Sequence, residues 1–418
     1  MANNNPIDHE KHLPTSAEDS GATSVTATEN EAEKHTEGQS GAEAVGEPAE
    51  VTDDELPHGF ALAAIVVAIM LATFLISLDQ TIVGTAIPKI TNQFRGLDKV
   101  SWYGSAYFMT FGGFQTAWGK AYKFCGLKTT FLVSLALFEI GSLVCGAAPN
   151  ANALIVGRAI AGFGGAGMAT GGFTIIAFSA APKQRPLFTG LVGSAYGLSA
   201  VAGPLIGGAF SDHVSWRWCF YVNLPVGGLA GAIILFFFRT PKGAKPQKAT
   251  WKETILNMDP VGVSLTMSLI ICFILALQYG GQTKAWDSSE VIGLLVGFVA
   301  IFAALIVWDY FQGELAMVPF RLMKQRFLWA TASFMFFFAG SYFILLYYLP
   351  IYFQSIHNTS AVGSGVRNLP MVVTFSIAAI LAGGFVQKTG IVTPVMLAGA
   401  SIATIGTGLI YTCKYPWK

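Results

Sequence analysis

Three ionisable side chains lie inside long apolar runs of the sequence. Asp79, Glu139 and Arg158 are each flanked by aliphatic and aromatic residues. A charged side chain deep in a membrane helix costs at least about 2.5–3.5 kcal/mol on insertion scales, so each needs a physical reason to be there. Uptake and release of protons is one such reason, and a fixed structural role is the other.

Asp79 and Arg158 are expected to lie in the same half of the membrane. Asp79 precedes Pro88 by nine residues, which at 1.5 Å per residue is a depth of roughly 13 Å. Arg158 falls about five residues into its run, a depth of roughly 8 Å. The two side chains could pair with each other, or each could reach the interface separately. Glu139 has no partner visible in the sequence, and packing and protonation roles both stay open for it.

The composition indicates a membrane protein. Hydrophobic residues make up 53% of the 418-residue chain and charged residues 12%, against roughly 25% charged in soluble proteins. A net charge of +1 excludes nucleic-acid binding by bulk electrostatics, so the expected partners are the lipid bilayer and a small molecule.

Eleven runs are long enough to cross a membrane, which takes roughly 20 apolar residues per helix. They are continuously apolar rather than alternating with a period of two, so they predict helices and not barrel strands. The runs are 60–87, 102–122, 129–148, 153–178, 187–210, 218–238, 260–279, 291–310, 327–353, 369–386 and 391–411. The predicted fold class is therefore all-α polytopic, with about eleven transmembrane helices.

The chain divides by composition into an acidic tail and an apolar body. Fourteen of the 24 acidic residues precede Leu56, and residues 1–57 contain too few apolar side chains to fold and lack a signal peptide. We predict a disordered cytoplasmic tail at 1–57, a six-helix bundle at 58–239, a basic cytoplasmic linker at 240–258, two extra helices at 259–310 and a partial bundle of three helices at 311–418.

The loop charges predict the orientation. With the N-terminus in the cytoplasm, the inner loops hold 14 lysines and arginines and the outer segments hold 8, as the positive-inside rule requires. The sequon at Asn358 then lies outside, available for glycosylation. We expect an integral multi-pass protein of the plasma membrane, with the vacuolar membrane as the alternative.

Small residues recur four positions apart on the fourth and fifth predicted helices. This spacing places them on one helix face, where two backbones can approach closely. The pairs are Gly167/Gly171, Gly193/Gly197 and Gly203/Gly207. They indicate either static packing or a sliding seam between helices that rock, with a kink at Pro204.

Four segments carry a family resemblance: 78–88, 203–208, 216–228 and 347–367. They resemble the fourteen-helix drug:proton antiporter branch of the major facilitator superfamily, and fungal toxin and drug efflux pumps in particular. The resemblance implies helical bundles that alternate access to a central site, with protons as the coupling ion and Arg158 as a candidate in coupling. It also implies a conformational motif at Gly203, Pro204, Gly207 and Gly208.

The loop after the second helix resembles the cytoplasmic gating loop of that family, at Gly119, Lys123, Gly126 and Lys128. Lys123 stands where the family has an acidic residue, so this loop and its lysines, Lys120 among them, could serve only to anchor the chain to lipid phosphates. Fourteen-helix members also have three helices more than this chain. We therefore expect the 418-residue chain to insert but to export poorly.

Other groups that could do chemistry have ordinary explanations. Asp259 and Asp309 fall at predicted helix ends, where a solvated carboxylate is expected. The six histidines all lie outside the helices, and no nucleotide-binding or nucleophile motif is present, so we expect no enzyme activity, no metal and no cofactor beyond a proton gradient. Aromatic residues crowd the run 327–353, either as part of a substrate pocket or facing lipid.

The resemblance therefore implies a secondary active efflux transporter that exports small apolar compounds, such as secondary metabolites, toxins or drugs, by proton antiport. Its coupling candidates are Asp79, Glu139 and Arg158. Two other classes stay open, a membrane sensor built on a transporter scaffold and an inactive truncated paralogue.

Overall fold

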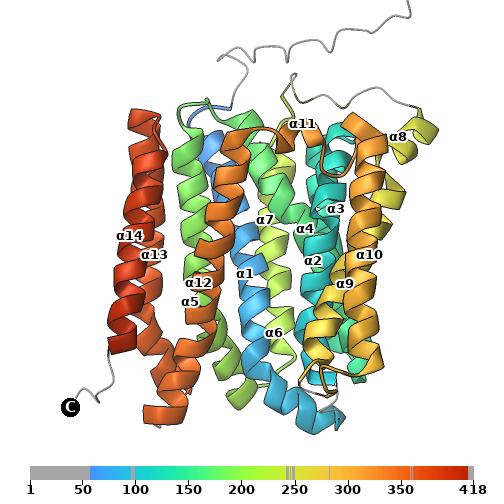
Figure 1. Ribbon diagram of the computed structural model, residues 1–418. Coiled ribbons are helices and arrows are strands. Elements are labelled where there is room, and N and C mark those ends of the chain that lie inside the picture. The colour runs from blue at the N-terminus through green and yellow to red at the C-terminus, as the bar shows by residue number, and fades with distance from the viewer. Residues whose placement is uncertain are drawn as a thin grey trace, which may run out of the picture. The chain divides into compact units, whose positions relative to one another are not determined.

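The computed structural model describes residues 57–95, 99–241, 244, 246, 250–281, 283–357, 359 and 361–412. These residues are almost entirely helical, and the β-structure among them is one isolated bridge between Gly280 and Lys284. The all-α prediction is therefore confirmed (Figure 1). The predicted tail, apart from Pro57, and the predicted sequon residue Asn358 lie outside the described residues.

The helices of the first half follow one another closely. They are α1 (Phe60–Phe94), α2 (Val100–Phe124), α3 (Leu127–Ala147), α4 (Ala151–Ser179), α5 (Arg185–His213), α6 (Trp218–Tyr221) and α7 (Asn223–Phe237). The short α6 and α7 are separated only by Val222, and Pro225 lies in the first turn of α7, where a missing backbone N–H costs little.

The second half begins with a short helix within the predicted basic linker. Its elements are α8 (Trp251–Asn257), α9 (Pro260–Tyr279), α10 (Ser289–Gln312), the 3₁₀ turn η4 (Gly313–Leu315), α11 (Phe320–Met323), α12 (Arg326–His357), α13 (Ala361–Thr389) and α14 (Thr393–Thr412). The five-part division proposed from the sequence stays a prediction.

Ten segments of the described chain are long and apolar enough to cross a membrane, with α6 and α7 counted together as Trp218–Phe237. All eleven predicted runs lie on helices. The run 102–122, on α2, is the one that is not apolar enough to count among these ten segments. The α2 helix carries tyrosines, glycines and two lysines, and it buries Tyr103 and Tyr107 against its neighbours.

The glycine-rich α4 packs against both α2 and α3, and this contact forms much of the core. Gly162 faces the backbone of Tyr107 on α2, and Gly164 faces the backbone of Phe138 on α3. A Cβ atom at either glycine would overlap these atoms, so only glycine allows this approach of the helices.

The α5 helix contacts α1 with one half and α13 with the other. Towards its N-terminus Gly197 lies against Phe375 and Ser376 of α13, and Ser376 donates a hydrogen bond from Oγ to the carbonyl of Ser194 (3.3 Å). The predicted small-residue face is thus a helix–helix contact, and it faces two different neighbours.

Candidate functional site: a buried ion pair and its surroundings

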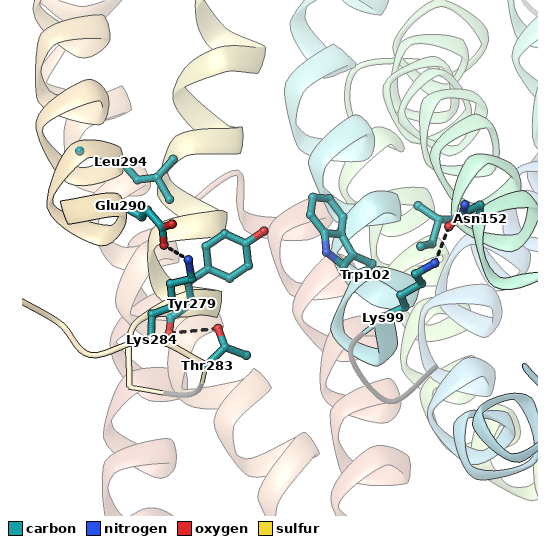
Figure 2. Close-up of a pocket in the computed structure, with 10 residues that line it drawn as sticks. Lys99, Trp102, Asn152, Tyr279, Thr283, Lys284, Glu290 and Leu294 are labelled. Atoms are coloured by element: carbon teal, nitrogen blue, oxygen red, sulfur yellow. Dashed lines mark hydrogen bonds and ion pairs between the residues drawn. The ribbon is translucent and has the colours of Figure 1, made fainter. Parts of the chain in front are cut away.

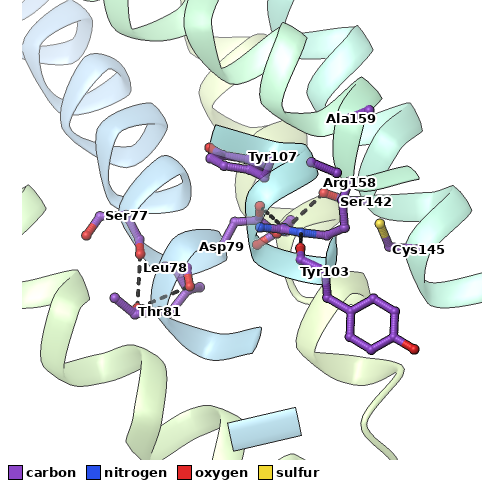
Figure 3. A network of polar contacts seen from close by, with 12 residues as sticks. Ser77, Leu78, Asp79, Thr81, Tyr103, Tyr107, Ser142, Cys145, Arg158 and Ala159 are labelled. Carbon is purple, nitrogen blue, oxygen red and sulfur yellow. Dashed lines mark hydrogen bonds and ion pairs between the residues drawn. The ribbon is translucent and has the colours of Figure 1, made fainter. Parts of the chain in front are cut away.

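Asp79 of α1 and Arg158 of α4 form an ion pair within the helical bundle (Figure 3). The relative exposure of the two side chains is 0% and 1%, so no part of the pair is solvated. Arg158 also donates from Nε to the backbone carbonyl of Tyr103 on α2 (2.9 Å). The structure therefore brings together the two residues that the sequence placed at similar depth, and neither reaches the interface separately.

The second oxygen of Asp79 faces an amide from the break between α6 and α7. Asn223, the first residue of α7, donates from Nδ2 to Asp79 Oδ1 (3.4 Å) and to Ser142 Oγ of α3 (3.1 Å). Asn223 is fully buried. One network thus joins α1, α3, α4 and α7, and its fixed charges, one carboxylate and one guanidinium, balance each other.

The aromatic ring of Tyr107 forms one wall of this network. The Arg158 guanidinium lies over the ring, with Cζ 4.4 Å from its centroid, which is a cation–π contact. Gly162 on α4 lets the two helices come this close, because a side chain there would overlap the Tyr107 backbone. The guanidinium is therefore held by charge, by hydrogen bonds and by stacking at once.

Glu139 of α3 lies near the network but outside its hydrogen bonds. Both of its carboxylate oxygens are buried, and among the described residues neither has a hydrogen-bond partner. The side chain faces Gly227 of α7, where an added Cβ would overlap the carboxylate, and the charge of Asp79 is close enough to act on it. An unpartnered buried carboxylate is far cheaper to hold with a proton than without one.

Two glycines of the predicted conformational motif lie on the face of α5 that contacts α1. Gly203 faces Thr81 and Ile82, and Gly207 faces Thr85 and Ile82. A Cβ at Gly203 would come 2.9 Å from Thr81 Cβ, closer than real side chains approach. The motif therefore packs against the same helix that carries Asp79, two residues from Thr81.

The other two motif residues behave differently. Gly208 has open space where a Cβ would lie. Pro204 is accommodated inside a helix that continues through it, and because proline lacks an N–H, the carbonyl of Ala200 has no donor from that position. The predicted kink and sliding motion at Pro204 stay predictions.

The predicted gating loop is largely helical: Gly119 and Lys123 lie in the last turns of α2, and Lys128 lies in the first turn of α3. Gly126 is the residue before α3, and Gly119 lies beside Thr170 of α4. Lys128 donates from Nζ to the carbonyl of Leu235 in the last turn of α7 (2.6 Å), and Lys123 is exposed beside its neighbour Phe124. Lys128 therefore contacts protein, contrary to the interpretation of this loop as a lipid anchor.

Lys120 also contacts protein, and an acidic residue is among its neighbours. Lys120 donates from Nζ to the carbonyl of Leu315 (2.6 Å) and lies 3.8 Å from Asp259 Oδ2. Asp259 and Asp309, predicted to be solvated, are 1% and 5% exposed. The prediction was wrong because α9 and α10 pack together and α9 packs on α2, which covers the ends of these helices.

A cavity of about 940 Å³ opens between α2 and the loop joining α9 to α10 (Figure 2). Its walls carry Trp102 and Tyr279, and its two lysines are already engaged: Lys99 donates to Asn152 Oδ1 (2.9 Å), and Lys284 pairs with Glu290. The cavity thus combines aromatic surface with one lysine paired to a carboxylate and one hydrogen-bonded to an amide. The sequence did not reveal it because its residues come from distant segments.

The crowded aromatic residues of α12 do not form a pocket within the described residues. Phe336 and Phe337 are 74% and 71% exposed. Tyr342 stacks on Phe375 of α13, with ring centroids 4.9 Å apart. Of the two interpretations left open, exposure favours a lipid-facing role for the first two residues and helix packing for the third.

Within the ranges that the structure describes, no three histidine, cysteine, aspartate or glutamate side chains gather as metal ligands would. The expectation that a proton gradient is the only energy source stays a prediction.

Three network residues escaped the sequence analysis: Tyr107, Ser142 and Asn223. The one available signal was an asparagine inside the otherwise apolar run 218–238.

Comparison with known proteins gives one family. The family model described as "Major Facilitator Superfamily" matches residues 69–417. The chain is 73% identical over 412 residues to the MFS-type transporter grgE of a Penicillium species, covering 98% of this chain and 73% of that protein. It is 54% identical over 360 residues to the probable efflux pump gsfJ of Penicillium aethiopicum, covering 86% of this chain and 64% of that protein.

Among solved structures, the fold resembles that of the proton:xylose symporter XylE. The TM-score is 0.51 at 12% sequence identity, over 78% of this chain and 70% of that chain. At this identity the likeness concerns the fold alone.

Proposed function

The chain belongs to the Major Facilitator Superfamily, and from this premise we propose that it is a secondary active exporter of small apolar compounds driven by proton antiport. It is an integral multi-pass membrane protein of a transporter family whose fungal members include efflux pumps. It spans 73% and 64% of the lengths of the two relatives described above, so its activity is proposed and not carried over from them.

The observation that carries the proposal is the buried pair of Asp79 and Arg158 beside an unpartnered Glu139. Buried charges in a membrane helix are expensive, and proton relays are one of their established uses. The pair is neutral while Asp79 is ionised. If Asp79 takes up a proton, Arg158 loses its counter-charge, and a second carboxylate that can release its proton restores the balance.

Glu139 fits this second role. Its oxygens have no hydrogen-bond partner among the described residues, and the charge of Asp79 acts on it. In the proposed cycle, a proton arriving at Asp79 frees Arg158, and Glu139 gives up its proton and attracts the guanidinium. Asn223, which bonds both Asp79 and Ser142, lies at the break between α6 and α7 and couples this exchange to helix position.

The substrate class rests on the names of relatives and on the cavity. One relative is called a probable efflux pump, and the cavity near Trp102 and Tyr279 offers aromatic surface with its lysines already paired. Pockets for small apolar ligands combine such surfaces with few polar groups. We propose the plasma membrane as the site of action, with the N-terminus in the cytoplasm.

The test is proton flux in liposomes that contain the purified chain and a fluorescent apolar dye. We expect a pH gradient to drive dye movement, slowly for the 418-residue chain, and the dye gradient to move protons in return. Asp79→Asn should uncouple the two fluxes. The double variant Asp79→Asn/Arg158→Gln removes both charges, so it should fold without a buried unbalanced charge yet remain uncoupled.

The control is Asp212→Asn, which removes an exposed carboxylate paired with Lys89 at 3.6 Å. It should leave both fluxes unchanged. Coupled transport at the wild-type rate by the double variant would show that the Asp79–Arg158 pair is structural and would remove the main support for proton coupling.

A further inference from the structure

A second buried polar cluster lies at the ends of α9 and α10, away from the residues of the proposed coupling site. Asp259 precedes α9 with a left-handed backbone (φ 53°). Its Oδ1 accepts hydrogen bonds from the backbone N–H of Gly262 (2.9 Å) and from Nε1 of Trp308 on α10 (2.8 Å). Its Oδ2 is buried and has no hydrogen-bond donor among the described residues.

Lys120 approaches this free oxygen from α2. Its Nζ lies 3.8 Å from Asp259 Oδ2 and donates to the carbonyl of Leu315, just after α10 (2.6 Å). One side chain of α2 therefore contacts both α9 and the segment that follows α10.

The third member of the cluster is Asp309 of α10. With both carboxylates ionised and Lys120 protonated, the cluster has a net charge of −1. The Asp309 side chain is 5% exposed, its Oδ1 has no hydrogen-bond partner in the described part of the chain, and it interacts electrostatically with Asp259 and Lys120. The remaining nearby charge is on Lys123, which is exposed and therefore screened by solvent. Glu314 and Arg321 are exposed and pair with each other at 3.4 Å.

Two buried carboxylates beside one partly buried ammonium group, which is 16% exposed, cannot all be charged at low cost. An unpaired buried charge is strongly unfavourable, and two carboxylates sharing a site favour the binding of one proton. One proton on either acid makes the cluster neutral.

We propose that Lys120, Asp259 and Asp309 form a proton-binding site, distinct from the Asp79–Arg158 network, whose occupancy controls the docking of the α9–α10 pair on α2. The proton binds to one of the two carboxylates. When it leaves, the excess negative charge favours solvation of the cluster and separation of α9 and α10 from α2.

The other contacts between α2 and the α9–α10 pair show why the cluster is important for docking. Midway along, Met267 of α9 packs closely into the space left by Gly113 of α2, and Ile270 lies near Gly112, so this contact is apolar. At the opposite end the cavity of about 940 Å³ separates Trp102 from Tyr279 (Figure 2). The cluster is therefore the main polar attachment of the α9–α10 pair to α2 among the described residues.

The test measures docking directly, with the full 418-residue chain in lipid nanodiscs. Nitroxide labels are attached to cysteines at Gly104 on α2, which has open space around it, and at Val296 on α10, which is 62% exposed. Cys125, Cys272 and Cys413 are replaced by serine. Pulsed electron resonance then gives the distance distribution between the labels as the pH is varied.

We expect one short distance at acidic pH and a second, longer population as the pH rises. Asp309→Asn leaves one carboxylate with one ammonium group, so the pair should stay docked throughout. Lys120→Met leaves two carboxylates that need two protons, so separation should begin at lower pH than in the unmodified chain. Lys123→Met, which removes an exposed charge, should match the unmodified chain.

An infrared measurement of the carboxyl stretch provides the second readout. A band from a protonated carboxyl group should titrate together with the distance change and should be missing in Asp309→Asn. Distances that do not change with pH, or an Asp309→Asn variant that separates like the unmodified chain, would overturn the proposal. Because neither readout uses transport, a failure here is distinct from a failure of the proposed export function.

Discussion

The Arg158 guanidinium stacks on the aromatic ring of Tyr107, with its carbon 4.4 Å from the centre of the ring. Both side chains are buried, at 0% and 1% exposure. A cation over an aromatic face gains about 2 kcal/mol or more when both partners are desolvated. The ring therefore contributes to holding a charge that α4 could not otherwise bury.

Replacing this ring tests the contact. Tyr107→Leu should lower the free energy of unfolding by about 2 kcal/mol, since it removes the aromatic face. Tyr107→Phe keeps the face and should lose much less. Thermal unfolding of the purified variants in detergent would measure both, and equal losses for the two would show that the aromatic ring itself contributes nothing to stability.

Gly227 and Gly228 form a matched pair for testing Glu139. A methyl group at Gly227 would overlap the Glu139 carboxylate, whereas one at Gly228 would meet nothing within 4 Å. Gly227→Ala should displace the carboxylate and reduce proton-coupled dye transport, while Gly228→Ala should not. Transport assays at matched protein abundance would check this, and similar activity for both variants would indicate that the position of Glu139 is unimportant for coupling.

The α1–α5 contact offers a second matched series. Gly203→Ala and Gly207→Ala should each cost about 1–3 kcal/mol of stability by overpacking against α1. Gly208→Ala, which points into open space, should be neutral. Unfolding midpoints would reveal the order, and a Gly208→Ala variant as unstable as the other two would contradict the packing shown here.

The orientation can be tested with an impermeant thiol reagent on intact cells. Lys284, 41% exposed, lies in the loop predicted to be outside, and Arg321, 76% exposed, lies in the segment predicted to be inside. In a background with Cys125, Cys272 and Cys413 replaced by serine, Lys284→Cys should react in intact cells and Arg321→Cys only after permeabilisation. The opposite pattern would place the N-terminus outside.

The helices and the depths of Asp79 and Arg158 could be predicted because both are local properties. Counting 1.5 Å per residue placed Asp79 and Arg158 at similar depths, and the structure pairs them. Asn223 could not be assigned to the network in advance, because its contact with Asp79 spans 144 residues and depends on how α7 packs against α1.

Asp259 and Asp309 show where local reasoning failed. Their positions at helix ends predicted solvation, yet both are buried, since the packing of α9 on α2 and α10 encloses them. Only the tertiary contact with Lys120 of α2 reveals the cluster. The sequence separation of 139 residues between Lys120 and Asp259 leaves no local pattern from which to predict it.

The faces that α5 presents to α1 and α13 have few interlocking side chains. Gly203 and Gly207 on one side and Gly197 on the other meet backbone, small side chains and one aromatic ring. Ordinary packed helices resist displacement because each knob must first leave its hole. Between α1 and α5 hydrogen bonds take the place of such knobs: Ser77 donates from Oγ to the carbonyl of Tyr196 (2.9 Å), and Ser199 donates from Oγ to the carbonyl of Phe74 (2.6 Å). A change of tilt between these two helices would therefore have to break these bonds.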